Sequence, residues 1–278
     1  MMAQLANGVE MPCIGMGTWP LRHKELIKAV VAGTSYGFKS IDAARDYGNE
    51  PSLAKALNKA YKINNISRNQ LFITSKIGND QQIKGNIKEE LKETLNNLKT
   101  DYLDLWLLHW PYPNLYTETW KQMEELYNEG KVKAIGVCNF HIHHFEELFQ
   151  ISNIKPMVHQ FEIHPLFTQE ELRKFCINQD IQIMAYTPTG RCDDRLMNNG
   201  ILNDISFRTN KTIVQVILRW HLQKGHIPVV RTFKVKHLKE NINIFDFELS
   251  QKEIEQIGSI NINSRLRYDS DNCDFYRL

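Results

Sequence analysis

The sequence has no apolar run that approaches the ~18 residues needed to cross a membrane. Its first residues, MMAQLANGVEMP, lack the basic-then-apolar pattern of a secretory signal peptide. The five cysteines are scattered and form no Cys-x-x-Cys pair, which disfavours a disulfide framework or a zinc site. We therefore expect a cytoplasmic protein with reduced thiols and no membrane partner.

A large charge of one sign is missing as well. The 34 Lys and Arg residues nearly balance the 32 Asp and Glu residues, which leaves a net charge of +2. No nucleic-acid partner is expected, because the sequence offers no broad basic surface. The composition, 42% hydrophobic and 24% charged, is that of an ordinary globular protein, and we expect a monomer.

What the sequence does contain is an alternation of short apolar runs and longer amphipathic segments, in which apolar residues recur every three or four positions. Such alternation predicts parallel β-α-β units. Eight units in 278 residues favour a closed (β/α)8 TIM barrel over an open doubly wound sheet. The open sheet is the weaker alternative, since its dinucleotide fingerprint is reduced to GMGTWP, without the third glycine. The eight runs are residues 13–17, 39–43, 72–76, 104–109, 133–137, 157–161, 183–186 and 227–230.

The N-terminal residues carry an Asn-Gly pair between two short extended pieces. This pair is a strong signal for a tight β-hairpin. We expect the hairpin to plug the N-terminal end of the barrel. We also expect the whole chain, residues 1–278, to form a single barrel domain.

Polar side chains stand at the ends of three consecutive predicted strands. Asp42, Lys76 and His109 occupy these ends, and Tyr47 follows the first of them in a loop. In a parallel barrel the carboxyl ends of all strands open on one face, where Asp42 and Lys76 would neutralise each other. Lys76 would also lower the pKa of the Tyr47 phenol, while His109 would orient a carbonyl oxygen. Such a set suits protonation of an oxygen that is gaining negative charge, as carbonyl reduction requires.

Several separate motifs occur in a fixed order along nearly the whole chain: NGVEMPCIGMGTW, YGFKSIDAARDYGNE, FITSK, YLDLWLLHWP, GKVKAIGVCNF, HQFEIHP, AYTPTG and LKENINIFDFEL. In these motifs the sequence resembles the aldo-keto reductases. The resemblance implies a barrel that binds a nicotinamide cofactor without a Rossmann motif, with NADPH preferred and NADH possible. It implies hydride transfer to an aldehyde or ketone. Tyr47 would give the proton, and Asp42, Lys76 and His109 would complete the catalytic set.

The resemblance also implies where the two ligands bind. Asn139 and Gln160 would hold the nicotinamide carboxamide, Tyr186 would stack on its ring, and the loop after Tyr186 would wrap the pyrophosphate. The implied cofactor set is Thr18, Trp19, Asp42, Cys138, Asn139, Gln160, Tyr186, Thr187, Thr189, Arg231, Thr232, His237, Glu240 and Asn241, and the implied set for a small carbonyl substrate is Trp19, Tyr47, His109 and Trp110.

Three places depart from the family pattern. His237 stands where the family has an arginine that clamps the 2′-phosphate, so the preference for NADPH should be reduced although Arg231 remains nearby. Gly78 replaces a bulky aromatic residue, which predicts a roomier pocket on that side. The tail from residue 263 onward is the only C-terminal lid candidate, which suggests an open site with broad substrate acceptance.

Two other functions are compatible with the same scaffold but fit the sequence less well. A non-catalytic nicotinamide-binding regulatory subunit is disfavoured by the intact set of four polar residues. A metal-dependent barrel enzyme would need clustered ligands at the strand ends. Asp42 and His109 stand there without further ligands, and Glu162 and His164 fall in a segment that the resemblance places around the cofactor.

One further motif, HIHH at residues 141–144, has the composition of a metal site. Adjacent histidines at the start of a helix point in different directions, and no cysteine or carboxylate nearby in the sequence completes a ligand set. We therefore interpret His141, His143 and His144 as part of a solvated loop, and expect no metal.

Overall fold

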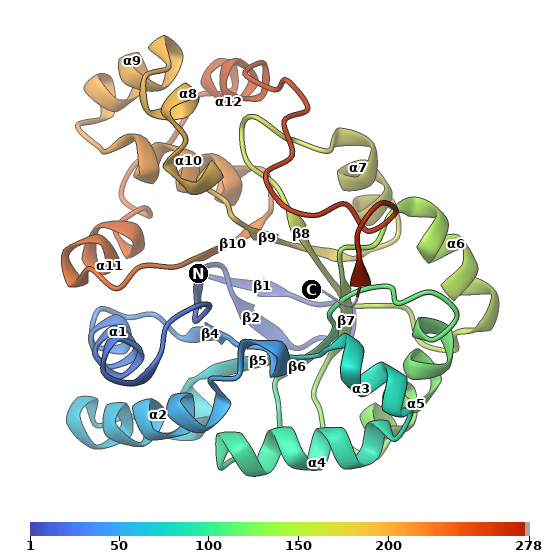
Figure 1. The fold of residues 1–278 in the computed structure, drawn as a ribbon. Coiled ribbons are helices and arrows are strands. Elements are labelled where there is room, and N and C mark those ends of the chain that lie inside the picture. The colour runs from blue at the N-terminus through green and yellow to red at the C-terminus, as the bar shows by residue number, and fades with distance from the viewer. Residues whose placement is uncertain (276–278) are drawn as a thin grey trace.

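The computed structural model describes residues 1–275, so the end of the predicted lid, residues 276–278, lies outside the described residues. Eight parallel strands close into a barrel in the order β10-β3-β4-β5-β6-β7-β8-β9, and helices surround it (Figure 1). The predicted (β/α)8 barrel is confirmed, and a strand coincides with or overlaps each of the eight predicted runs. The strands are β3 (Gly15–Gly17), β4 (Ser40–Asp42), β5 (Phe72–Ile77), β6 (Leu105–Leu108), β7 (Ile135–Cys138), β8 (Val158–Glu162), β9 (Gln182–Tyr186) and β10 (Ile227–Val230).

The helices begin and end where local chemistry allows. At the start of α10, for example, the Thr212 hydroxyl accepts a hydrogen bond from the amide of Gln215, whose side chain accepts one from the Thr212 amide. The helices are α1 (His23–Ser35), α2 (Glu50–Asn64), α3 (Asn79–Lys84), α4 (Ile87–Leu98), α5 (Tyr116–Asn128), α6 (Ile142–Ile151), α7 (Glu170–Asn178), α8 (Asp194–Met197), α9 (Gly200–Thr209), α10 (Ile213–Gln223), α11 (Val235–Ile242) and α12 (Gln251–Gly258), with short 3₁₀ turns η1 (Arg45–Tyr47), η2 (Arg68–Gln70) and η3 (Gly190–Cys192).

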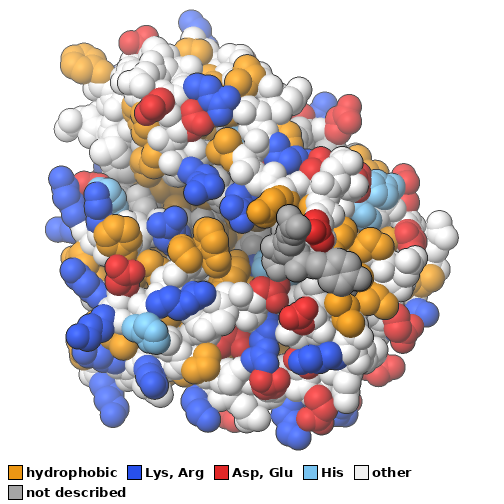
Figure 2. All heavy atoms as spheres, viewed as in Figure 1, with side chains coloured by type: hydrophobic (Ala, Val, Ile, Leu, Met, Phe, Trp, Pro, Cys, Tyr) orange, Lys and Arg blue, Asp and Glu red, His pale blue; other side chains and the backbone are white. Residues whose placement is uncertain are grey.

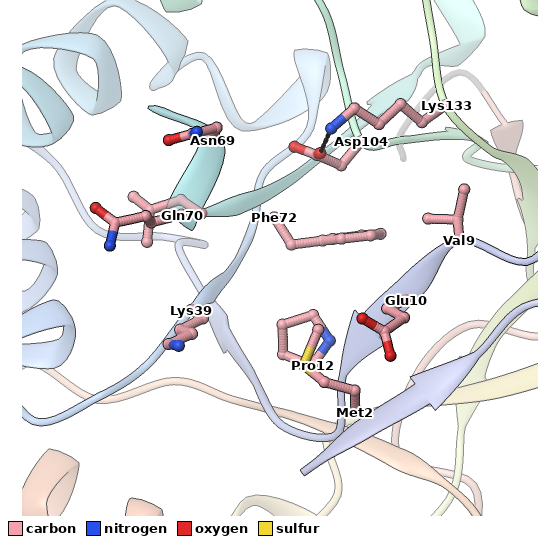
Figure 3. Close-up of a pocket in the computed structure, with 11 residues that line it drawn as sticks. Met2, Val9, Glu10, Pro12, Lys39, Asn69, Gln70, Phe72, Asp104 and Lys133 are labelled. Atoms are coloured by element: carbon pink, nitrogen blue, oxygen red, sulfur yellow. Dashed lines mark hydrogen bonds and ion pairs between the residues drawn. The ribbon is translucent and has the colours of Figure 1, made fainter. Parts of the chain in front are cut away.

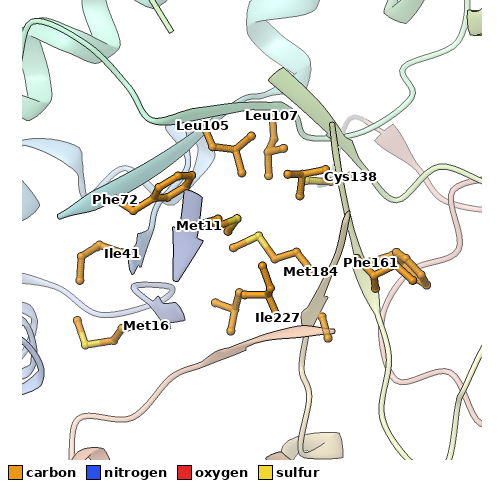
Figure 4. Packing of buried hydrophobic residues seen from close by; sticks show 14 of the residues in the cluster. Met11, Met16, Ile41, Phe72, Leu105, Leu107, Cys138, Phe161, Met184 and Ile227 are labelled. Atoms are coloured by element: carbon orange, nitrogen blue, oxygen red, sulfur yellow. The ribbon is translucent and has the colours of Figure 1, made fainter. Parts of the chain in front are cut away.

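The barrel interior is packed with apolar side chains from all sides. Leu105, Leu107 and Met184 come from β6 and β9 and point toward the axis, with Met11 beside them, as Figure 4 shows, and all four are fully buried. Unbranched methionines fill irregular gaps between the branched side chains. The barrel is therefore a solid core, and only its ends are available for a site.

The predicted hairpin is present at one of those ends. Strands β1 (Met2–Gln4) and β2 (Glu10–Pro12) pair antiparallel, and Met11 is fully buried against the barrel core (Figure 4). A cavity of about 290 Å³ lies between the hairpin and residues at the N-terminal ends of the barrel strands, such as Lys39, Phe72 and Asp104 (Figure 3). The hairpin thus closes the N-terminal end, as predicted, and leaves the carboxyl end for function.

Two expectations from composition can also be compared with the structure. All five cysteines are free, as their spacing predicts. Within residues 1–275, no helix combines the length and the apolar character that crossing a membrane would require.

Three buried histidines give the fold a predictable response to acid. Burial lowers the pKa of His221 to about 3 and holds the pKa values of His159 and His226 well below their ordinary range. Below about pH 6.5 the unfolded chain binds protons that the folded chain does not, so acidification should cost roughly 1.4 kcal/mol of stability per pH unit for each histidine. We expect the free energy of unfolding in urea to fall steeply between pH 6.5 and pH 5. A level curve over that interval would contradict neutral buried rings.

Candidate active site

The ends of β4 and β5 bring a lysine and an aspartate into direct contact. Asp42 pairs in register with Thr74, so Lys76, two residues further along β5, faces the same side of the sheet. The Lys76 ammonium donates to both carboxylate oxygens of Asp42, at 2.9 and 2.8 Å, and to the carbonyl of Ala43 at 2.9 Å. Its side chain is fully buried, which makes the paired carboxylate essential for keeping it charged.

The same lysine reaches the tyrosine predicted from the loop. Lys76 Nζ lies 3.1 Å from the Tyr47 hydroxyl, so Asp42, Lys76 and Tyr47 form one hydrogen-bonded chain, as the strand-end pattern predicts. Burial would lower the pKa of Lys76, but the Asp42 carboxylate outweighs it and the pKa is raised. Lys76 is therefore held as a cation beside the phenol.

The pKa of Tyr47 is raised in the structure, whereas the sequence predicted that Lys76 would lower it. Burial raises the pKa of Tyr47 to about 12, and the opposing effect of the Lys76 charge is smaller. Sequence reasoning counted the cation but had no measure of desolvation. The consequence is that the phenol keeps its proton at neutral pH and can act as a donor.

His109 follows the end of β6, and its ring meets the Tyr47 ring edge-on with centroids 5.8 Å apart. The ring is oriented by a residue that sequence reasoning missed. His109 Nδ1 lies 2.8 Å from Oδ2 of Asp46, in the 3₁₀ turn η1 just before Tyr47. Because a carboxylate can only accept, the proton of this hydrogen bond belongs to Nδ1. The signal was an acidic residue directly before the tyrosine.

The Asp46 carboxylate lies beside Gly78, in the space that a side chain at position 78 would occupy. A Cβ atom built on Gly78 would overlap the Asp46 carboxylate, so the glycine makes room for the Asp46–His109 pair. The roomier pocket expected from Gly78 is wrong at this point, because a neighbouring loop fills the space with charge.

The predicted nicotinamide-binding residues lie on or directly after the next three strands: Cys138 and Asn139 at the end of β7, Gln160 on β8 and Tyr186 on β9. Cys138, Gln160 and Met184 are in register on β7, β8 and β9, and the Gln160 amide donates to Asp42 at 2.9 Å. Asn139 donates to the His109 carbonyl at 3.0 Å and accepts from the Tyr186 hydroxyl at 2.6 Å. These contacts join the two halves of the predicted site into one network.

Two amide side chains, Asn139 and Gln160, offer both donors and acceptors beside the Asp42–Lys76–Tyr47 chain. Such groups fit a carboxamide, which also has one donor group and one acceptor. The residues present are therefore suited to hold a nicotinamide ring next to the phenol.

The remaining predicted cofactor residues continue around the barrel. Thr18 follows β3, where its hydroxyl donates to the Asp42 carbonyl at 2.9 Å, and Thr187 and Thr189 follow β9. Arg231 and His237 are exposed, after β10 and in the first turn of α11. The other predicted residues on this side are partly or fully buried: Thr232, just after β10, and Glu240 and Asn241, in α11.

The C-terminal tail touches the predicted substrate residues and runs across this end of the barrel (Figure 1). Trp19 is 42% exposed, and the Arg267 guanidinium lies 5.3 Å from the centre of its ring. Trp110 is buried, with the ring of Phe275 against it edge-on at 6.4 Å. The segment predicted as a lid is therefore in place over the residues predicted to line the mouth.

The alternative ligand set of a metal-dependent enzyme is not assembled here. Glu162 pairs with His164 at 2.9 Å and accepts the backbone amides of Leu266 and Arg267. These residues anchor the tail. Among residues 1–275, the groups with metal-ligand spacing do not include Asp42, His109, Glu162 or His164.

This barrel and its strand-end chain of Asp42, Lys76 and Tyr47 define the class of protein. The model of the Aldo/keto reductase family matches residues 13–262, and the chain belongs to that family. It is thus an oxidoreductase that depends on a nicotinamide cofactor.

Individual relatives match over almost the full length. The chain is 43% identical to the uncharacterized oxidoreductase YtbE of Bacillus subtilis strain 168 and 41% identical to the glyoxal reductase of the same organism, each over 98% of this chain and 97% of the relative. Among solved structures, a Bombyx mori aldo-keto reductase in complex with NADP is 29% identical, with a TM-score of 0.90 over 98% of this chain and 96% of that one.

Proposed function

We propose that the chain reduces aldehydes and ketones to alcohols by hydride transfer from NADPH, with Tyr47 as the general acid. The observation that carries the proposal is a half-buried phenol 3.1 Å from a lysine that is itself charge-paired to Asp42. In the same proposal one barrel domain, residues 1–278, acts as a monomer in the cytoplasm. The complete set of four polar residues argues against a merely regulatory subunit.

Each residue has a distinct role in this mechanism. Bound NADPH supplies the hydride. Tyr47 donates its proton to the carbonyl oxygen as that oxygen gains charge, and Lys76 stabilises the phenolate that remains. Asp42 keeps Lys76 charged, and His109 orients the carbonyl. Arg231, Thr232 and the N-terminal turn of α11 offer positive charge and donors that fit a phosphate.

The proposal is tested by following NADPH absorbance with purified chain and a panel of aldehydes, with EDTA present. Glyoxal and methylglyoxal are the first substrates to try, since a glyoxal reductase is 41% identical. We expect NADPH oxidation that depends on the aldehyde and survives the chelator. Activity that EDTA abolishes and zinc restores would contradict a metal-free reduction.

Asp46 should determine how well His109 orients the carbonyl. Its carboxylate accepts the Nδ1 proton of His109 at 2.8 Å and so fixes the direction of the ring. Asp46→Ala removes that partner, so kcat/KM for aldehydes should fall by about tenfold, equal to 1.4 kcal/mol. Fluorescence titration should show NADPH binding unchanged.

A matched variant keeps the Asp46 carboxylate but moves it away from His109. In Gly78→Ala the added methyl overlaps the carboxylate and displaces it. Its kcat/KM should fall as in Asp46→Ala. Wild-type kcat/KM in both variants would mean that Asp46 does not orient His109.

Cofactor choice should respond to His237. An imidazole stands where the family has a permanently charged, bidentate guanidinium for the 2′-phosphate, and charge-assisted hydrogen bonds are roughly twice as strong as neutral ones. His237→Arg should tighten NADPH binding by about tenfold, equal to 1.4 kcal/mol, and leave NADH binding unchanged. Fluorescence titrations at pH 8 measure both dissociation constants. Equal NADPH affinity in the two proteins would mean that His237 faces away from the phosphate.

A further inference from the structure

The three histidines of the HIHH motif meet two carboxylates from the distant C-terminal tail. His141 Nε2 lies 2.8 Å from Asp269, and His143 Nε2 and His144 Nε2 lie 3.3 and 3.6 Å from Asp271. The interpretation of this motif as a solvated loop is wrong, because it assumed that no carboxylate completed the set. Figure 2 shows histidine and acidic side chains gathered over the start of α6.

The spacing of these groups is that of metal ligands. His141, Asp269 and Asp271 place one ligand atom each within 4.8 Å of one another, and so do His143, His144 and Asp271. Ligand atoms on a tetrahedral zinc lie about 3.3 Å apart, since Zn–N and Zn–O bonds are about 2.0–2.2 Å long. The observed separations of 2.8–3.9 Å bracket that value, and Asp271 belongs to both groups and so joins them.

Charge in the cluster also favours a cation. Asp269 has a guanidinium nearby, Arg265 at 3.5 Å, whereas within residues 1–275 the ion pairs of Asp271 are with histidines alone. A divalent cation would neutralise the two carboxylates.

The hydrogen bonds of the cluster separate the side chains that could bind an ion from His144, which only orients one of them. His144 Nδ1 accepts the backbone amide of His141 at 3.0 Å, which leaves the His144 proton on Nε2, facing Asp271. His144 therefore orients Asp271 and does not bind the ion itself. The tail is shaped to match, because the amide of Asp271 donates to the Asp269 carboxylate at 3.1 Å in a tight turn.

We propose that His141, His143, Asp269 and Asp271 bind a transition-metal ion of the zinc type. The ion would clip the C-terminal tail to the start of α6. Imidazole together with carboxylate suits zinc better than magnesium or calcium, which prefer oxygen ligands alone. A surface cavity of about 790 Å³ borders His141, His143 and Asp271 and gives an ion access.

The clip would act on the mouth of the barrel. Asp269 and Asp271 lie between Arg267, which stacks on Trp19, and Phe275, which packs on Trp110. An ion bound between these two contacts would hold the intervening tail in place. The site is separate from the proposed chemistry, which needs no metal, so its binding can be measured without any assay of reduction.

Calorimetric titration of chelator-treated full-length protein with Zn²⁺ tests the site. We expect one Zn²⁺ per chain in the wild type, and an affinity at least about tenfold weaker in His143→Gln and in Asp271→Asn. His23→Gln, at an exposed histidine in α1, is the matched control and should bind as the wild type does. Absence of Zn²⁺ binding, unchanged affinity in both ligand variants, or equally tight binding of Mg²⁺ would overturn the proposal.

Limited trypsin digestion tests the clip, since Arg265 and Arg267 offer cleavage sites in the tail. Zn²⁺ should slow cleavage there several-fold in the wild type and in His23→Gln, and not at all in Asp271→Asn. Zn²⁺ binding that leaves the cleavage rate of the wild type unchanged would overturn the clip.

Discussion

Tyr47→Phe should retain the fold and the cofactor site but lower kcat for aldehyde reduction by at least about 100-fold, the cost typical of losing a general acid. The variant keeps the aromatic ring and removes only the hydroxyl that lies 3.1 Å from Lys76 Nζ. Rapid mixing of the NADPH complex with aldehyde measures the chemical step. Fluorescence titration measures NADPH binding, which we expect to change little.

The pKa of Tyr47 adds a condition to this expectation. Because burial raises that pKa to about 12, the phenol stays protonated from pH 6 to pH 9 and should contribute no slope to the rate in that range. A Tyr47→Phe enzyme that reduces aldehydes at nearly the wild-type rate would show that the proton comes from elsewhere.

Lys76→Met should be the most destabilising single change in the site. The lysine is fully buried, and its loss strips Asp42 of its only ion-pair partner within the described residues. Breaking a buried pair in this way ordinarily costs about 3–5 kcal/mol, because a charge is left without compensation. Urea unfolding followed by tryptophan fluorescence measures the loss.

The double variant Asp42→Asn, Lys76→Met separates stability from chemistry. A neutral amide at position 42 can still accept from Gln160, so more than half of the lost stability should return. Reduction should remain lost, since no cation is left beside Tyr47. A loss below about 1 kcal/mol in Lys76→Met would mean that the pair behaves like one at the surface.

The barrel and its central site could be predicted because they follow from short-range pattern. Asp42 and Lys76 end neighbouring parallel strands, and parallel strands deliver their ends to one face. The contact of Asp46 with His109 could not be predicted in this way. It joins two loops, and it depends on the missing side chain of Gly78 as much as on the residues present.

The contact between the HIHH motif and the C-terminal tail could not be predicted either, because it joins residues that are still further apart in the sequence. More than a hundred residues separate His141 from Asp269, and no periodicity records the path of an irregular segment over the surface. The pKa of Tyr47 was mispredicted for a related reason. Its value depends on how much water the folded chain excludes around the hydroxyl, and the sequence lists neighbours without giving that depth.

The hairpin at the base of the barrel has a kinetic consequence. β1 and β2 close that end, and Met11 is fully buried beneath the core. In the proposed reaction the cofactor and the substrate would therefore both enter and leave at the carboxyl end of the barrel. Gln160, proposed to hold the nicotinamide, is buried, whereas Trp19, proposed to line the substrate mouth, is exposed at the rim. In this proposal the cofactor would lie deeper than the substrate. When two ligands use the same opening, the one that binds deeper must bind first and leave last. Release of the oxidised nucleotide, the last step, would then limit the turnover rate whichever alcohol was formed.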